Sequence, residues 1–131
     1  MESRCIFPAS VDNLHEMLQY VSLNALNPRF EADQVLQIEL ALEEAIVNII
    51  KHGYKESSGI IEIHWAYVDN GVRLKLIDSG IPFNPLQNVT IPEVGSIGGY
   101  GISMITKIMD SSYEHTDGFN ILTLSKNLSK I

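Results

Sequence analysis

The chain has 131 residues, of which 45% are hydrophobic and 19% are charged, and its formal net charge at pH 7 is −7. This length and composition predict one compact domain over residues 1–131, with enough apolar chain to form a core. The acidic balance argues against a nucleic-acid or a membrane-surface partner, because both favour a basic face. It does not exclude a small anionic ligand held by a local site.

Three further features of the sequence concern its compartment. Cys5 is the only cysteine, so the chain has no internal disulfide, which fits a reducing compartment. The N-terminus shows no charged-then-apolar pattern of the kind found in leader sequences. No apolar run is long enough to span a bilayer. We therefore expect a cytoplasmic protein.

The first part of the chain predicts one strand followed by two helices. Residues 4–8 are apolar and are expected to form an edge strand. Ser10 is expected to cap a helix that continues to about residue 26, before Asn27-Pro28 breaks it. A longer helix is expected over residues 31–52, because apolar residues recur along it at helical spacing. They are Ile38, Leu42, Ala45, Ile46 and Ile49.

The later part of the chain predicts two β-hairpins. Apolar and polar residues alternate with period two on either side of two turn sequences, which is typical of paired strands. The turns are Asp69-Asn70-Gly71 and Asp117-Gly118. The four predicted strands are residues 60–68, 72–76, 112–116 and 120–126.

A loop and a third helix separate the two hairpins. Residues 86–97 show no periodicity, and Gly98-Gly99-Tyr100-Gly101 then opens a helix that ends at Asp110-Ser111. The predicted order is therefore β-α-α-β-β-loop-α-β-β. Strands joined by tight turns pair antiparallel, and the helices need a sheet face to cover. We expect an α/β two-layer sandwich, with a mixed, mostly antiparallel sheet and helices on one face.

One face of the long helix carries residue types that suit a metal–phosphate site. Glu44 and Asn48 are four residues apart and Lys51 follows three later, so their side chains are expected to line up. A carboxylate can take a proton, an amide oxygen can ligate Mg²⁺, and an ammonium can meet a phosphate oxygen. The same row is also typical of a solvated helix face. Gly53 is expected to end the helix in the left-handed conformation.

Two glycine-containing segments follow this helix. Asp78-Ser79-Gly80 stands at the end of a predicted strand, where Asp78 can accept a hydrogen bond from the adenine amine and repel the guanine carbonyl. Gly80 would let the backbone approach the base, since it has no Cβ. Gly98-Gly99-x-Gly101 precedes a helix, whose free N–H groups and dipole favour phosphate. Each segment alone is also typical of an ordinary turn or hinge.

The order of these motifs resembles the GHKL ATP-binding superfamily, which has the Bergerat-type fold and includes gyrase, histidine-kinase and mismatch-repair ATPase domains. Residues 44–53 match its N box, 78–80 its first glycine box, and 98–101 its second. The chain looks closest to the bacterial anti-sigma factors that are also serine-protein kinases, the partner-switching regulators. This closer resemblance rests on Glu44-Ala45-x-x-Asn48, His52-Gly53-Tyr54, Asp78-x-Gly80-x-Pro82-Phe83 and Gly99-x-Gly101-Ile102-x-Met104. It covers nearly the whole chain.

The resemblance implies roles, ligands and partners. Glu44 would act as general base toward a serine hydroxyl, Asn48 would hold the Mg²⁺ that bridges the ATP phosphates, and Asp78 would read adenine. The other ATP-binding residues would be Lys51, Gly80, Gly98, Gly99, Gly101 and Ile102. The substrate would be an anti-anti-sigma protein of the STAS type, and the second partner would be a sigma factor. A homodimer is also implied.

The segment between the two glycine boxes departs from the family pattern. Residues 88–97 are short and hold no Lys or Arg, only Glu93, whereas kinases of this branch often carry a longer lid with a basic residue. Lys51 is then the evident local cation, so ATP binding is better supported than kinase activity. Residues 86–97 are expected to close over the nucleotide. The alternatives are an ATP-gated binding module without phosphotransfer, and the catalytic half of a histidine kinase, although no phosphoacceptor-histidine helix pair precedes the domain.

Overall fold

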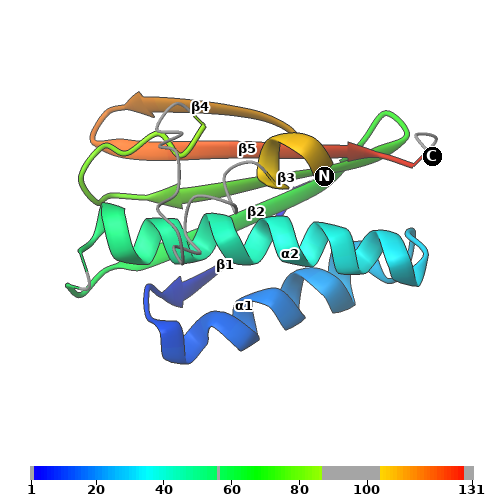
Figure 1. Ribbon diagram of the computed structural model, residues 1–131, viewed down its shortest axis with the longest axis horizontal. Helices are drawn as coiled ribbons and strands as arrows, with labels where there is room; N and C mark the ends of the chain where they lie inside the picture. The colour runs from blue at the N-terminus through cyan, green and yellow to red at the C-terminus, as the bar shows by residue number, and fades with distance from the viewer. Residues whose placement is uncertain (1, 56, 87–103, 129–131) are drawn as a thin grey trace, which may run out of the picture.

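The computed structural model of the chain describes residues 2–55, 57–86 and 104–128, and its centre is a five-stranded sheet (Figure 1). The strands are β1 (Ser3–Pro8), β2 (Ile60–Val68), β3 (Gly71–Asp78), β4 (Asp110–Thr116) and β5 (Phe119–Asn127). They lie in the order β1-β2-β3-β5-β4, and each neighbouring pair is antiparallel. The predicted strands and the predicted edge position of the first one are therefore confirmed.

Two long helical segments precede the second strand. The first consists of η1 (Val11–Asn13), α1 (Leu14–Val21) and the wider π turn η2 (Ser22–Leu26), and the second of α2 (Ala32–Asn48) and the π turn η3 (Ile49–Gly53). The Ser10 hydroxyl accepts from the Asp12 amide at 3.2 Å, which confirms the predicted N-cap. Both helices therefore begin and end close to their predicted limits.

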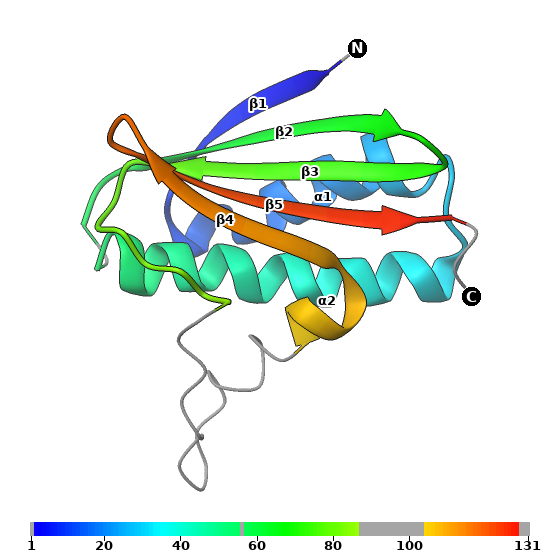
Figure 2. The same cartoon turned by 90° about the horizontal axis from the view of Figure 1, so that it is seen from above.

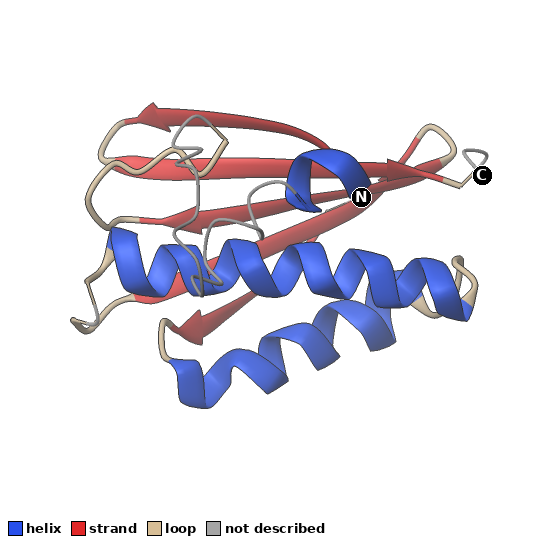
Figure 3. Ribbon diagram, in the orientation of Figure 1, coloured by secondary structure: helices blue, strands red, loops and turns tan. Residues whose placement is uncertain are grey.

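The helices and the sheet form two layers. α1 and α2 lie on the same side of the sheet in both views (Figures 1 and 2), and colouring by secondary structure separates a helical layer from a strand layer (Figure 3). The apolar face predicted for the long helix is buried at all five positions. The largest fully buried side chains between the layers include Met17, Ile38, Leu42, Ile46, Ile61, Leu74 and Leu124. The predicted two-layer sandwich is confirmed, because burial of these side chains requires both layers.

The end of the long helix differs from the sequence expectation. Gly53 does not adopt a positive φ, and the left-handed conformation falls on Lys55, at φ 51°. The Tyr54 amide donates to the Ile49 carbonyl at 3.0 Å, which closes a π turn in place of the expected glycine cap. The prediction of a left-handed Gly53 was therefore wrong, and a close contact described below accounts for the glycine.

The third helix is described only from residue 104. Residues 104–108 are helical, and Ile105 and Met109 are buried in the core. Its predicted opening at residues 98–101, and the loop before it, lie outside the described residues. Within the described ranges, no helix is both long enough and apolar enough to cross a membrane.

Two leucines of α2 provide a test of the core. Leu42 is fully buried and Leu36 is 58% exposed on the same helix. We expect Leu42→Ala to lower the free energy of unfolding by about 2–5 kcal/mol, because it leaves a cavity between the layers. Leu36→Ala is the matched control and should change it by less than about 0.5 kcal/mol. Urea denaturation measures both, and equal losses would contradict this packing.

Candidate functional site

The site is built where the end of α2 meets the end of β3. The Gly53 carbonyl accepts from the Ile81 amide at 2.8 Å, so the two segments are joined through their backbones. A Cβ on Gly80 would lie 2.6 Å from the Gly53 carbonyl carbon, closer than real Cβ atoms come. A larger residue at position 80 would therefore force one of the two backbone segments to shift. The predicted role of Gly80 in letting a ligand approach stays a prediction, and the structure shows that Gly80 also makes room for Gly53.

Tyr54 locks the same junction from the other side. Its hydroxyl donates to the Ile60 carbonyl at 2.6 Å and accepts from the Ser79 amide at 2.9 Å. The side chain is buried, so these bonds are shielded from water. One tyrosine therefore ties the end of the long helix to the start of β2 and to the turn after β3.

A small pocket opens beside this junction. It is lined by Asn48, Ile49, Gly53, Asp78, Ile81, Phe83, Pro85, Tyr113, Asn120 and Leu122. Its enclosed volume is about 10 Å³, roughly the room that one water molecule needs. The loop after β3 contributes Ile81, Phe83 and Pro85, and Phe83 stacks on His52 with ring centroids 4.8 Å apart. A purine base would enter only if this loop wall moved, because the other lining residues belong to helices and strands.

Asp78, the predicted base-reading residue, is buried in the pocket wall. It is 6% exposed, and its Oδ1 accepts from the Gly80 amide and from Asn120 Nδ2, both at 2.9 Å. Burial raises the pKa of Asp78, while the bonds from Asn120 and Gly80 and the nearby His115 act in the opposite direction. No described residue donates a hydrogen bond to Oδ2. Among the described residues, Oδ2 is thus the carboxylate oxygen that receives no donor.

Asn48, the predicted metal ligand, is also buried at the pocket. It is 5% exposed, and its Nδ2 atom has no hydrogen-bond partner among the described residues. An unpaired buried N–H donor costs free energy, so it favours a ligand with an acceptor such as a phosphate oxygen, whereas a metal ion would be held by the amide oxygen of Asn48. The described residues include no group of three or more His, Cys, Asp and Glu that could hold a metal ion. An Mg²⁺ ion at Asn48 would therefore take most of its ligands from phosphate and water, as Mg²⁺ often does.

Glu44 and Lys51 lie outside the pocket lining. Glu44 is half-buried, and burial, followed by the neighbouring charge of Glu43, raises its pKa, while Lys51 lowers it. Lys51 is exposed, in contrast to Asn48. The three residues of the predicted row therefore lie in different environments: Asn48 is buried, Glu44 is half-buried and Lys51 is exposed. A carboxylate with increased proton affinity is better suited to accept a proton than an ordinary surface glutamate.

Four predicted phosphate-binding residues fall outside the part of the chain that the structure describes. They are Gly98, Gly99, Gly101 and Ile102, and residues 87–97 of the predicted lid are also outside it. Their roles stay predictions.

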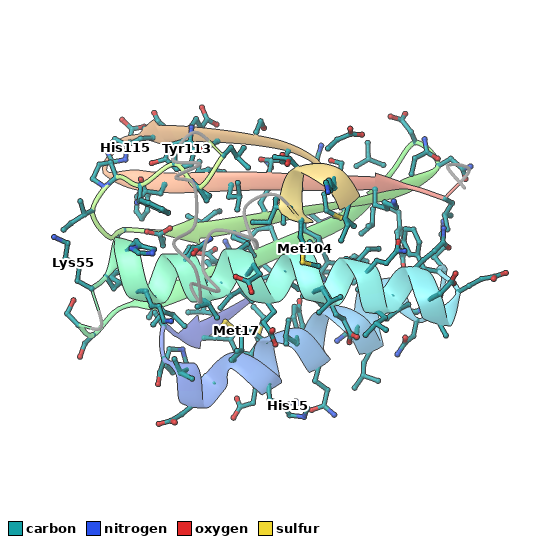
Figure 4. The ribbon with its side chains drawn as sticks, viewed as in Figure 1. His15, Met17, Lys55, Met104, Tyr113 and His115 are labelled. Carbon is teal, nitrogen blue, oxygen red and sulfur yellow. The ribbon has the colours of Figure 1, made fainter. Side chains whose placement is uncertain are left out.

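Sequence reasoning missed three polar residues of the last hairpin. Asn120 lies on β5 and is 3% exposed, and the Tyr113 hydroxyl and His115 Nδ1 lie 2.6 and 2.8 Å from its Oδ1. Figure 4 shows Tyr113 and His115 together on β4. Burial raises the pKa of Tyr113, so its hydroxyl stays protonated at neutral pH. Asn120 could have been found from the period-two pattern of β5, because that pattern places it on the same inner face as Leu122 and Leu124.

The Gly53–Gly80 contact predicts a difference between two glycine substitutions. Gly80→Ala should lower the free energy of unfolding by about 1–3 kcal/mol, because backbone atoms would have to shift. Gly53→Ala should cost less than about 0.5 kcal/mol, since its Cβ would meet Asp78 Oδ1 at an ordinary 3.5 Å. Chemical denaturation of both variants measures the difference. An equally tolerated Gly80→Ala would contradict the close contact.

The buried charge of Asp78 predicts a pH-dependent gain in stability on its removal. Because the folded pKa of Asp78 is raised, the folded state binds its proton more tightly than the unfolded state. Stability therefore falls as the pH rises from the ordinary aspartate pKa through the raised folded pKa, and the cost of the buried charge is present above that range. Asp78→Asn should unfold at a higher temperature than the unmodified protein at pH 7. The gain should vanish below about pH 3.9, the ordinary aspartate pKa, and an unchanged gain at acid pH would contradict this origin.

The amino-acid sequence is similar to those of serine-protein kinases from two bacterial genera. Serine-protein kinase RsbW of Bacillus cereus (strain AH820) is 29% identical over 103 residues, covering 71% of this chain and 64% of that protein. RsbW of Staphylococcus aureus (strain JH9) is 24% identical over 111 residues, covering 75% of this chain and 69% of that protein. The chain thus spans a little under two thirds of the length of the Bacillus relative.

Solved structures show the same fold at lower identity. Acinetobacter baumannii histidine kinase AdeS superposes with a TM-score of 0.59 at 15% identity, covering 98% of this chain and 68% of that one. The blue-light activated histidine kinase of Erythrobacter litoralis EL346 gives 0.58 at 14%, covering 91% and 61%. The model of the histidine kinase-like ATPase domain matches residues 7–126. With its antiparallel sheet, its helical layer and this match over most of its length, the chain belongs to the histidine kinase-like ATPase domain family.

Proposed function

We propose that this protein is an ATP-binding serine/threonine protein kinase and anti-sigma factor. Its substrate would be an anti-anti-sigma protein of the STAS type, and it would sequester a sigma factor. The observation that carries the nucleotide site is a pocket shared by two buried polar groups with unused capacity, Asp78 Oδ2 and Asn48 Nδ2. The similarity to serine-protein kinases supports the protein substrate.

Asp78 would select the base. An ionised carboxylate only accepts hydrogen bonds, so its free oxygen suits the exocyclic amine of adenine and opposes the carbonyl of guanine. The apolar lining beside it, Ile49, Ile81 and Leu122, suits the flat faces of a purine. Adenine is therefore the base that this pocket wall favours.

Asn48, Lys51 and Glu44 would act along the phosphates. Bound Mg²⁺ would neutralise phosphate charge, and Asn48, which is buried in the pocket lining, would hold it. Lys51 would supply a positive charge near the phosphate oxygens. The serine oxygen would attack the γ-phosphorus while ADP leaves, and Glu44 would take the proton of the hydroxyl. The raised pKa of Glu44 supports this general-base role.

The glycine segment would complete the phosphate site. We infer from the family resemblance that the amides of Gly98, Gly99 and Gly101, with Ile102, hold the phosphates at the start of a helix. Residues 88–97 carry no Lys or Arg. Less transition-state charge would then be neutralised than in a kinase with a basic lid, so transfer should be slow.

The same missing basic residue favours a second candidate function. A protein that binds ATP without transferring phosphate could still regulate a partner by nucleotide-dependent sequestration. Both candidates share the adenine pocket and differ only at Glu44 and the lid. A cytoplasmic homodimer is part of either proposal.

Two substitutions separate the proposed roles. Glu44→Ala should leave Mg-ATP affinity within about threefold while reducing phosphotransfer at least about 100-fold, because a general base acts only on the hydroxyl. Asn48→Ala should instead abolish the dependence of ATP affinity on Mg²⁺. Titration calorimetry with and without Mg²⁺ measures binding. Transfer is measured with γ-labelled ATP and a purified STAS-type anti-anti-sigma protein.

Four results would be informative. Equal affinities of the unmodified protein for ATP and GTP would contradict the role of Asp78. Similar binding losses in both variants would contradict the division of labour between Glu44 and Asn48. Tight, adenine-selective binding without label on the STAS-type protein would favour the sequestration module. Label on the STAS-type protein that appears with the unmodified protein and is absent with Glu44→Ala would support the kinase.

A further inference from the structure

Asn120 occupies a position that connects three strands at the pocket. It lies on β5, opposite Asp78 of β3 and opposite His115 of β4 in the sheet register. Its Nδ2 donates to Asp78 Oδ1 at 2.9 Å and to the Gly80 carbonyl at 3.1 Å. Because a backbone carbonyl can only accept, these contacts fix which end of the Asn120 amide is the donor.

The other end of the amide is held equally firmly. With Nδ2 as donor, Oδ1 is an acceptor, so the Tyr113 hydroxyl donates to it at 2.6 Å and His115 Nδ1 donates at 2.8 Å. An asparagine side chain has two donor and two acceptor positions. All four are filled here, so a turn of the Asn120 amide would break hydrogen bonds at both ends.

This arrangement sets the direction of the Asp78 carboxylate. Oδ1 accepts from Asn120 and from the Gly80 amide, which lie on different segments. Two donors on one oxygen restrain the carboxylate plane, so it cannot rotate to present a different face. Oδ2, which receives no hydrogen bond from a described residue, is then the oxygen left for a ligand.

We propose that Asn120, held by Tyr113 and His115, is a positioning residue that fixes the Asp78 carboxylate and thereby makes the pocket selective for a purine with a 6-amino group. The proposal rests on the proposed nucleotide function. It adds a cause for selectivity: a carboxylate that can rotate must be ordered when the ligand binds, whereas a fixed one already presents its free oxygen to the 6-amino group and gains the full hydrogen bond. Asn120 acts through Asp78 and needs no contact of its own with the base.

The test compares ATP with purine riboside triphosphate, which lacks only the 6-amino group. The unmodified protein should bind ATP about tenfold more tightly, the value of one hydrogen bond to a charged group. Asn120→Leu should reduce this ratio to about twofold or less, while the affinity for purine riboside triphosphate stays nearly unchanged. A general structural defect would weaken both nucleotides together and leave their ratio intact.

A milder variant covers the case in which Asn120→Leu fails to fold. Tyr113→Phe removes one donor to Asn120 Oδ1 and keeps the ring, so it should lower the ratio in the same direction by a smaller factor. Tyr67→Phe is the matched control, because the Tyr67 hydroxyl donates to the Ala25 carbonyl, away from the pocket. The control should keep the ratio of the unmodified protein.

A second readout uses the nucleotide-free protein. The carboxyl carbon of Asp78, assigned by its loss in Asp78→Asn, is titrated by NMR in the unmodified protein and in both variants. Asn120→Leu removes a hydrogen bond that stabilises the ionised form, so it should raise the pKa of Asp78. Tyr113→Phe loosens Asn120 without removing that bond, so it should raise the pKa by less. Tyr67→Phe should leave the pKa unchanged.

The outcomes separate this inference from the proposed function. A reduced ratio and a raised Asp78 pKa in both pocket variants would support the inference. If the unmodified protein prefers ATP but the variants keep its ratio, Asn120 has no positioning role and the nucleotide function stands. If the unmodified protein binds neither triphosphate, the nucleotide function and the inference both fail.

Discussion

The close approach of two backbone segments, at Gly53 and Gly80, is the constraint on which the site depends. The Gly53 carbonyl accepts from the Ile81 amide at 2.8 Å, and no Cβ fits on Gly80. The contact joins the end of α2, which carries Asn48, to the end of β3, which carries Asp78. Tyr54 strengthens the same junction through Ser79 and Ile60. Two polar groups from separate layers therefore meet at one pocket because their backbones touch.

That pocket contains polar groups that do not stabilise the fold. Burial raises the pKa of Asp78, and Asn48 Nδ2 has no hydrogen-bond partner in the described part of the chain. Both features cost free energy, whereas apolar residues of similar size would pack without penalty. Natural proteins concentrate such departures from good packing at functional sites. The apolar core between α2 and the sheet supplies the stability that makes this cost tolerable.

The parts of the structure that the sequence predicted correctly are those set by local rules. Period-two and helical spacing located β2 and α2 because each pattern lies within one element. Asn120 was missed because its partner, Asp78, is 42 residues away and the pairing depends on strand register. Gly53 was misassigned for a related reason. A helix-ending glycine usually marks a left-handed residue, and only the fold shows Gly80 packed against it.

The pocket combines a rigid wall with a movable one. Asp78 and Asn120 belong to strands in the sheet, where hydrogen bonds on several sides hold them in place. Phe83 and Pro85 belong to the loop beyond the Ile81–Gly53 bond, where the ring stacking of Phe83 on His52 is worth about 0.5–1.5 kcal/mol and the Phe83 backbone bonds to Tyr113. Opening the pocket for a base therefore costs little compared with misplacing Asp78. Because access and selectivity depend on different elements, a change in the loop can alter how readily a nucleotide enters without altering which base is preferred.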